Sequence, residues 1–307
     1  MDRRGILAAG ASIVGGSVAS LALAAKRTPS PRTSVAGQFI ETHDGTALFY
    51  QDFGAGKPVV FVAPWALGCD WWEYEMAALV GRGMRCIAYD RRGQDRSTQP
   101  ARGYDFDTLA DDLSAVLDTL DLREVTLVGH SMGAAETVRY LSRHGSARVA
   151  RLVLVAPITP QVVKTAGNPD GIDPQILEKG RATLAKDRAG AIGRAAPAFF
   201  GAPTNTVSPE LTQWWVQLML RCPLPLMLEL HRSFTETDFA PDLPRISVPT
   251  LVVHGDKDVS ALIDLTGRRT AQAIRDARLV VYDGAAHGLP ITHMERLNEE
   301  IFRFASV

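Results

Sequence analysis

A serine between two glycines is the residue whose setting points most directly to chemistry. Residues 129–133 read Gly-His-Ser-Met-Gly, directly after the apolar run 125–128 and before the helical pattern 132–143. A serine at such a strand-to-helix turn presents its hydroxyl, and the glycines let backbone and helix approach closely. The helix N-terminus adds N–H groups and a partial positive charge that stabilise an oxyanion. The pattern therefore predicts that Ser131 is a nucleophile for acyl transfer.

A serine hydroxyl is a weak nucleophile and needs a neighbouring base. His287 follows the apolar run 278–282 and is flanked by small residues, which leave an imidazole accessible. Among the other histidines, we expect His130 to point away from the site and His254 to hydrogen-bond locally. Four more have no comparable position and context: His43, His144, His231 and His293. His287 is therefore the predicted base.

An acid that orients the histidine is expected in the loop after the strand 250–254. Residues 254–258 read His-Gly-Asp-Lys-Asp, so Asp256 and Asp258 are both candidates. We favour Asp258 as the acid and interpret Asp256 as a residue that caps the local turn. The chain order Ser, Asp, His is the order of the α/β-hydrolase fold. All three residues follow strands, so they are expected at the same edge of a parallel sheet.

Two backbone N–H groups are expected to hold the oxyanion. One is the N–H of Met132, the residue after the serine. The other should come from the loop after the strand 59–63, which reads Ala-Pro-Trp-Ala-Leu from residue 63. Pro64 has no N–H, so Trp65 is the candidate.

Alternating strands and helices from residue 37 onward predict the framework that positions these residues. An Asp-Gly turn joins the first two strands, and the later strands are short and uniformly apolar. Such strands, separated by helices, predict a mostly parallel sheet covered on both faces. The expected strands are 39–42, 48–53, 59–63, 85–89, 125–128, 152–155, 250–254 and 278–282, and the expected helices are 70–82, 106–120, 132–143, 262–274 and 293–304.

Residues 158–245 break this alternation because they contain no convincing strand. We interpret them as a helical cap inserted after the sixth strand, with a core formed by residues 37–157 and 246–307. Large apolar side chains of the cap are candidates for an acyl or aryl pocket, and packing within the cap explains each of them equally well. They are Phe199, Phe200, Trp214, Trp215 and Leu218.

The first 25 residues differ in kind from the rest of the chain. Arg3 and Arg4 precede an uncharged stretch rich in Ala, Gly and Ser, with small residues near Ala24. This resembles a twin-arginine export signal and predicts a periplasmic protein, the alternative being an uncleaved N-terminal membrane anchor. Residues 26–36 read as a linker.

The composition excludes several classes of protein. The formal net charge is -1 and no basic block follows the first residues, which argues against a nucleic-acid partner. The three cysteines, Cys69, Cys86 and Cys222, have no spacing typical of a disulfide framework or a zinc site. No residue cluster has metal-ligand spacing, and no cofactor is expected.

Five segments together resemble one known group of proteins. Residues 89–97 read Tyr-Asp-Arg-Arg-Gly-Gln-Asp-Arg-Ser, and the other segments are 72–76, 136–140, 164–169 and 234–239. They resemble the bacterial cofactor-free haloperoxidases, or non-heme chloroperoxidases, which act as aryl esterases and perhydrolases. The resemblance covers residues 37–305. It implies Asp258 as acid, His287 as histidine, Trp65 and Met132 as oxyanion donors, and no haem, metal or flavin.

Two departures from that group fall in the loop of the oxyanion hole. The group usually has His-Gly where this chain has Ala63-Pro64, and Trp-Pro where it has Trp65-Ala66. A proline at position 66 would orient the Trp65 carbonyl toward a bound peroxide. We therefore expect a better esterase than perhydrolase, and expect Ala66→Pro to raise the ratio of perhydrolysis to hydrolysis.

These residues predict hydrolysis of aryl or short-acyl esters through an acyl-enzyme, with possible perhydrolysis of a carboxylic acid by peroxide. A lactonase and a non-catalytic ligand-binding protein of the same fold are the alternatives. A haloalkane dehalogenase or epoxide hydrolase is disfavoured because those enzymes need a carboxylate nucleophile, and residue 131 is serine. The oligomeric state is left open.

Overall fold

The computed structural model describes residues 38–307. The predicted export signal, linker and first core residue lie outside this range. Within it, no helix combines the length and the apolar character needed to cross a membrane.

An eight-stranded sheet forms the centre of the molecule, with the spatial order β1-β2-β4-β3-β5-β6-β7-β8. The pairs β1–β2 and β2–β4 are antiparallel, and every other pair is parallel. The predicted mostly parallel sheet is thus confirmed. The strands are β1 (Gln38–Glu41), β2 (Ala47–Gly54), β3 (Pro58–Val62), β4 (Arg85–Tyr89), β5 (Val125–His130), β6 (Val149–Val155), β7 (Thr250–Gly255) and β8 (Ala277–Tyr282).

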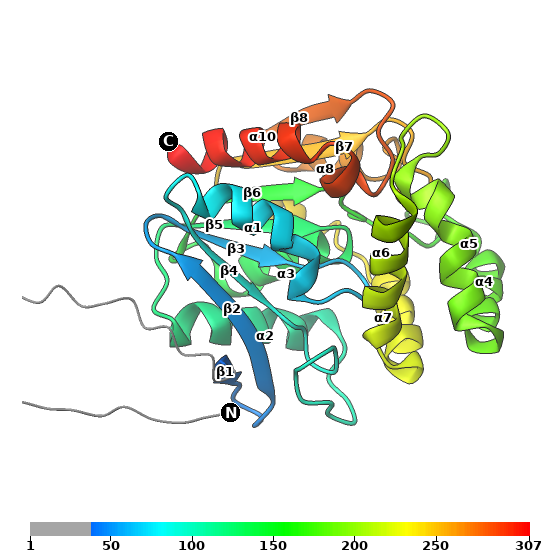
Figure 1. The fold of residues 1–307 in the computed structure, drawn as a ribbon, viewed down its shortest axis with the longest axis horizontal. Coiled ribbons are helices and arrows are strands. Elements are labelled where there is room, and N and C mark those ends of the chain that lie inside the picture. Colours follow the sequence, from blue (N-terminus) through cyan, green and yellow to red (C-terminus); the bar gives the residue numbers. More distant parts are fainter. Residues whose placement is uncertain (1–37) are drawn as a thin grey trace, which may run out of the picture. The chain divides into compact units, whose positions relative to one another are not determined.

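Helices cover both faces of this sheet (Figure 1). In β3, Val59 and Phe61 enter one apolar core while Val60 and Val62 enter the other. This alternation explains why the strands are apolar at nearly every position. The first core also contains residues of α1 (Glu73–Val80) and α10 (Met294–Ser306), and the second contains residues of α2 (Phe106–Thr119) and α3 (Met132–His144).

Four helices of equal length follow β6 and precede β7, where the cap was expected. They are α4 (Pro174–Lys186), α5 (Arg188–Phe200), α6 (Pro209–Arg221) and α7 (Leu224–Glu236). The side chains of Asp173, Asp187 and Ser208 accept hydrogen bonds from first-turn N–H groups and so fix the starts of α4, α5 and α6. In Figure 1 the four helices gather at the end of the sheet toward which the parallel strands point.

Two expected helices differ in the structure. The helix expected at 262–274 is only α8 (Gly267–Ala273), because the backbone of Thr266, with φ -127° and ψ -84°, is not helical. The helix expected at 70–82 is a short 3-10 turn, η1 (Cys69–Trp72), followed by α1. The last helix, expected at 293–304, is α10, and a separate short helix, α9 (Leu289–Thr292), precedes it.

Candidate active site

Ser131 lies at the sharp turn between β5 and α3. Its φ of 56° is in the left-handed region that side-chain-bearing residues rarely adopt, and its N–H donates to the Val155 carbonyl at 2.9 Å. The flanking glycines are required by space: a Cβ at Gly133 would lie 2.2 Å from the Val62 carbonyl oxygen, and one at Gly129 would lie 2.5 Å from that of Gly133. The glycines therefore let the turn sit directly against the neighbouring backbone.

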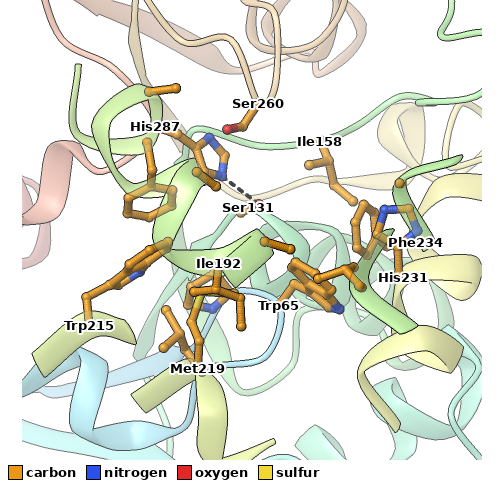
Figure 2. A pocket seen from close by; sticks show the side chains of 18 of the residues that line it. Trp65, Ser131, Ile158, Ile192, Trp215, Met219, His231, Phe234, Ser260 and His287 are labelled. Atoms are coloured by element: carbon orange, nitrogen blue, oxygen red, sulfur yellow. Dashed lines mark hydrogen bonds between the residues drawn. The ribbon is translucent and has the colours of Figure 1, made fainter. Parts of the chain in front are cut away.

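A continuous hydrogen-bonded chain joins Ser131, His287 and Asp258. The His287 Nε2 atom lies 2.9 Å from the Ser131 hydroxyl (dashed in Figure 2), and its Nδ1 atom lies 2.6 Å from an Asp258 carboxylate oxygen. All three side chains are nearly buried. The structure thus brings together three residues from separate strand ends in the geometry of a nucleophile, a base and an orienting acid.

The surroundings of Asp258 stabilise its charged form. Its second carboxylate oxygen accepts the N–H groups of Ser260 and Ala261, both at 2.8 Å. Burial alone raises the pKa of the Asp258 carboxyl, but the charge of His287 and hydrogen bonds from His254 and His287 outweigh it and hold that pKa well below its usual range. A carboxylate at this position therefore stays ionised while the imidazole gains a proton.

Asp256 occupies the same loop but faces elsewhere. One of its carboxylate oxygens accepts the Gly284 N–H at 2.7 Å, and the other lies 3.1 Å from the Lys257 ammonium. It joins the two loops that carry the acid and the histidine, rather than capping its own turn as predicted.

Two further histidines support His287. His130 does not point away as expected: its Nε2 lies 3.1 Å from the His287 carbonyl oxygen, and the ring stacks on Trp71. Burial and the neighbouring His287 hold the pKa of His130 well below its usual range, so the neutral ring donates to that carbonyl. His254 bonds locally to the Ala261 carbonyl at 2.8 Å and also lies 3.2 Å from Asp258.

The predicted oxyanion donors are the backbone N–H groups of Trp65 and Met132. Met132 is the first residue of α3, where an N–H has no acceptor within its own helix. Within residues 38–307, neither N–H donates to a backbone carbonyl. Both groups are therefore free to bind an anion.

Contacts from the core and from the cap hold the Trp65 loop in place. The buried Arg91 guanidinium donates to the Ala63 carbonyl at 2.7 Å and to the Glu136 carboxylate of α3 at 2.7 Å. From the cap, the Met227 carbonyl of α7 accepts the Trp65 indole N–H at 2.9 Å. The sequence marked Arg91 and Glu136 only as parts of resembling segments, and their positioning role is visible only in space.

The backbone of Ala66 bears on the proline prediction. Its φ is 61°, whereas a proline ring fixes φ near -65°. A proline at this position cannot follow the present path of the loop, so the premise of the Ala66→Pro prediction does not hold for this chain.

A cavity of about 460 Å³ opens onto Ser131 and His287. Most of its wall is apolar and comes from the cap helices and the Trp65 loop (Figure 2). Of the five side chains expected to line a pocket, Phe199 and Trp215 do so. Phe199 also ties the cap to the site, since its carbonyl accepts the Gly288 N–H at 2.7 Å.

The other three expected side chains do not line this cavity. Trp214 turns toward the core and stacks on Trp71, with ring centroids 6.3 Å apart. Phe200 packs edge-on against Trp215 and borders a separate cavity formed by α5 and the loop after it. Leu218 is buried in the core.

Helix geometry explains which cap residues reach the cavity. Trp215 and Met219 are four residues apart and share one face of α6, whereas Trp214 is rotated from that face by about 100°. On α7, His231 and Phe234 are three residues apart and both line the wall. The spacing from Trp215 could have identified Met219 from the sequence, whereas nothing in the sequence indicated His231 or Phe234 as cavity residues.

The histidines, cysteines and carboxylates of residues 38–307 form no group of three or more that could hold a metal ion. Cys69, Cys86 and Cys222 are all free and buried. Burial raises the pKa of the Cys86 and Cys222 thiols to about 12, so neither is a reactive thiolate at neutral pH.

Comparisons with known proteins agree with this geometry. Residues 59–300 match the model of the alpha/beta hydrolase family. The chain is 41% identical over 268 residues to a non-heme chloroperoxidase of Kitasatospora aureofaciens, which covers 86% of this chain and 97% of that protein. It is 34% identical over 272 residues to a bifunctional esterase/perhydrolase of Acinetobacter calcoaceticus, covering 87% of this chain and 98% of that protein.

A solved structure shows the same likeness in three dimensions. The bromoperoxidase of Bacillus anthracis superimposes with a TM-score of 0.84 at 33% identity, covering 89% of this chain and 100% of that one. The expected fold and the resemblance to non-heme haloperoxidases are both confirmed. The chain belongs to the alpha/beta hydrolase family and, within it, to the group of non-heme haloperoxidases and esterase/perhydrolases.

Proposed function

We propose that this protein hydrolyses carboxylic esters with apolar aryl or short-acyl groups through an acyl-enzyme on Ser131. The observation that carries the proposal is the hydrogen-bonded chain from Ser131 through His287 to Asp258, at the floor of a largely apolar cavity. The names of the relatives, among them an esterase/perhydrolase, support the same reaction class.

In the proposed reaction each group has one role. The His287 Nε2 atom takes the proton of the Ser131 hydroxyl as its oxygen attacks the ester carbonyl. The Asp258 carboxylate stabilises the imidazolium and holds its tautomer through the bond to Nδ1. The N–H groups of Trp65 and Met132 bind the oxyanion of the tetrahedral intermediate. His287 then gives its proton to the departing alcohol, and water releases the acyl group by the same steps.

Perhydrolysis is a second activity that the relatives favour. Hydrogen peroxide in place of water would release the acyl group as a peracid, which can oxidise a halide ion. This reaction uses a carboxylic acid and peroxide as substrates and needs no group beyond the same side chains. Bromination of monochlorodimedone with acetate and peroxide, compared with hydrolysis of p-nitrophenyl acetate, measures the balance between the two.

Covalent labelling tests the central proposal. A fluorophosphonate probe should label the wild type at Ser131 alone, and Ser131→Ala should lose about 10⁶-fold in kcat on p-nitrophenyl acetate while keeping its folded circular dichroism. Labelling at another residue, or a variant that keeps most of its activity, would remove the proposal. A wild type that neither reacts nor turns over would favour a non-catalytic binding protein.

We further propose that residues 1–25 direct export to the periplasm, because Arg3 and Arg4 precede an uncharged stretch of small residues. The paired changes Arg3→Lys and Arg4→Lys should then retain precursor in the cytoplasm. Protein recovered from the periplasm with Met1 still attached would instead indicate an uncleaved anchor.

A further inference from the structure

A histidine on the cavity wall has no part in the acyl transfer described above. His231 comes from α7 of the cap and lines the cavity together with Phe234. Figure 2 places these two side chains on one side of Ser131, and Trp215 and Met219 on the other. The cavity therefore has an apolar side at α6 and a side at α7 that carries an imidazole.

Neighbouring side chains hold this imidazole in place. Its ring packs edge-on against the Trp65 indole, with centroids 5.4 Å apart, and lies 5.0 Å from the Phe234 ring. Its Nδ1 atom faces the Arg181 guanidinium at 3.5 Å. Arg181 is itself fixed by the Glu178 carboxylate at 2.7 Å. The orientation of the ring is thus set before any ligand arrives.

The contact with Arg181 also favours one tautomer of the ring. A guanidinium has only donors, so the nitrogen that faces it must be the unprotonated acceptor. Burial and the positive charge of Arg181 lower the pKa of His231 to about 4, so the ring is neutral at neutral pH. The hydrogen is therefore on Nε2, which has no hydrogen-bond partner in the part of the chain that the structure describes.

A fixed donor in an apolar cavity selects among ligands. When a purely apolar ligand fills the cavity, the donor loses its water and gains nothing in return. A ligand that presents an oxygen acceptor at the same place keeps that hydrogen bond, and a site of this kind discriminates against analogues that lack the acceptor.

We propose that His231 is a specificity-determining residue whose Nε2–H binds an oxygen acceptor, an ether or carbonyl, carried by the substrate away from its reacting ester group. The substrate class is an ester with an apolar body and one such acceptor. The inference rests on the proposed ester hydrolysis and adds to it the chemical group that the α7 side of the cavity recognises.

Pairs of esters with the same shape test this directly. In the alcohol series, 4-methoxyphenyl acetate is compared with 4-ethylphenyl acetate. In the acyl series, phenyl 3-methoxypropanoate is compared with phenyl pentanoate. In each pair an ether oxygen replaces a methylene, and the two series distinguish whether the acceptor belongs to the leaving group or to the acyl group. The quantity measured is the kcat/KM of the ether ester divided by the kcat/KM of its methylene counterpart, for the wild type and for each variant.

We expect the ratio in one of the two series to fall about fivefold in His231→Leu relative to the wild type, chiefly through KM, as the loss of one neutral hydrogen bond implies. His231→Gln carries an amide N–H near the position of Nε2 and should restore the ratio. Phe234→Leu changes the same wall without removing a donor, so its ratio should match that of the wild type.

The outcomes separate this inference from the proposed function. A His231→Leu ratio equal to the wild-type ratio in both series would overturn the role of His231 while leaving ester hydrolysis intact. An equal fall in Phe234→Leu would also overturn it, because the effect would then be one of shape. A wild type that hydrolyses none of the four esters would instead contradict the proposed function.

Discussion

At the scale of single residues, the two aspartates of one loop have different surroundings. The Asp258 carboxylate contacts His287 at 2.6 Å, whereas Asp256 accepts a backbone N–H from the neighbouring loop. A carboxylate that touches the imidazole sets its tautomer and its charge balance. A carboxylate that joins two loops affects only their relative position.

We therefore predict that Asp258→Asn lowers kcat on an aryl ester by roughly 10⁴-fold, since the amide no longer stabilises the imidazolium. Asp256→Asn is the matched control and should cost less than about tenfold. Both are measured as kcat at pH 8 on purified protein with unchanged circular dichroism. A reversal of the two losses would move the acid to Asp256.

At the scale of elements, the site depends on close contact between the turn that carries Ser131 and the Trp65 loop. Gly133 of α3 faces the Val62 and Ala63 carbonyl oxygens, which a Cβ would approach to 2.2 and 2.6 Å. Arg91 links the same two segments, because it donates to both the Ala63 carbonyl and the Glu136 carboxylate. Any added volume between them separates the nucleophile from an oxyanion donor.

Gly133→Ala should therefore lower kcat by at least about 100-fold, because a shift of about 1 Å in a catalytic group has that effect. Gly193→Ala is the control, since Gly193 lies within α5 and a Cβ there has open space around it. That change should leave kcat unaltered and raise stability by up to about 1 kcal/mol. Equal activities of the two variants would show that the contact at Gly133 is not restrictive.

The left-handed backbone at Ala66 leads to a second prediction about this loop. Ala66→Pro should lower the melting temperature and reduce esterase and perhydrolase rates together, because the loop must be rebuilt around the fixed φ of the ring. Ala66→Gly keeps the present path and should keep both rates. A proline variant with unchanged melting temperature and a higher perhydrolysis ratio would show that the loop can take another path.

At the scale of the whole molecule, a buried carboxyl makes stability depend on pH. Glu75 of α1 is fully buried, and neither carboxylate oxygen has a hydrogen-bond partner within residues 38–307. Burial raises the pKa of Glu75 from 4.5 to about 8. The folded protein thus keeps a proton that the unfolded chain releases, so this group's contribution to stability is complete below pH 4.5 and is lost as the pH rises through 8.

Glu75→Gln has nearly the same shape and cannot ionise. The variant should therefore gain stability relative to the wild type as the pH rises from 5 to 8.5, on the order of a few kcal/mol, which amounts to several degrees in melting temperature. Thermal unfolding of both proteins across this range checks the difference. Curves that stay parallel would mean that Glu75 gains a partner or remains solvated.

The sequence by itself determined the features that local patterns encode. Apolar runs of four to six residues separated by helical spacing were enough to predict the sheet, the break at residues 158–245 and the turn that carries Ser131. The serine, the histidine and their order could be predicted because each follows a strand in its own segment. Helix bounds were predicted less accurately, as at α8, which begins only at Gly267 after the non-helical Thr266.

Only the tertiary structure decided which side chains meet. Helix rotation placed Trp215 on the cavity and turned Trp214 toward Trp71, although the two are adjacent in sequence. Contacts between segments far apart along the chain also determine three other features. They are the left-handed backbone at Ala66, the hydrogen bond from Arg91 to the Trp65 loop and the position of His231. Local sequence patterns determine whether a segment forms a helix or a strand. Contacts between distant segments depend on how the whole chain packs, and a residue's neighbours in sequence do not encode that packing.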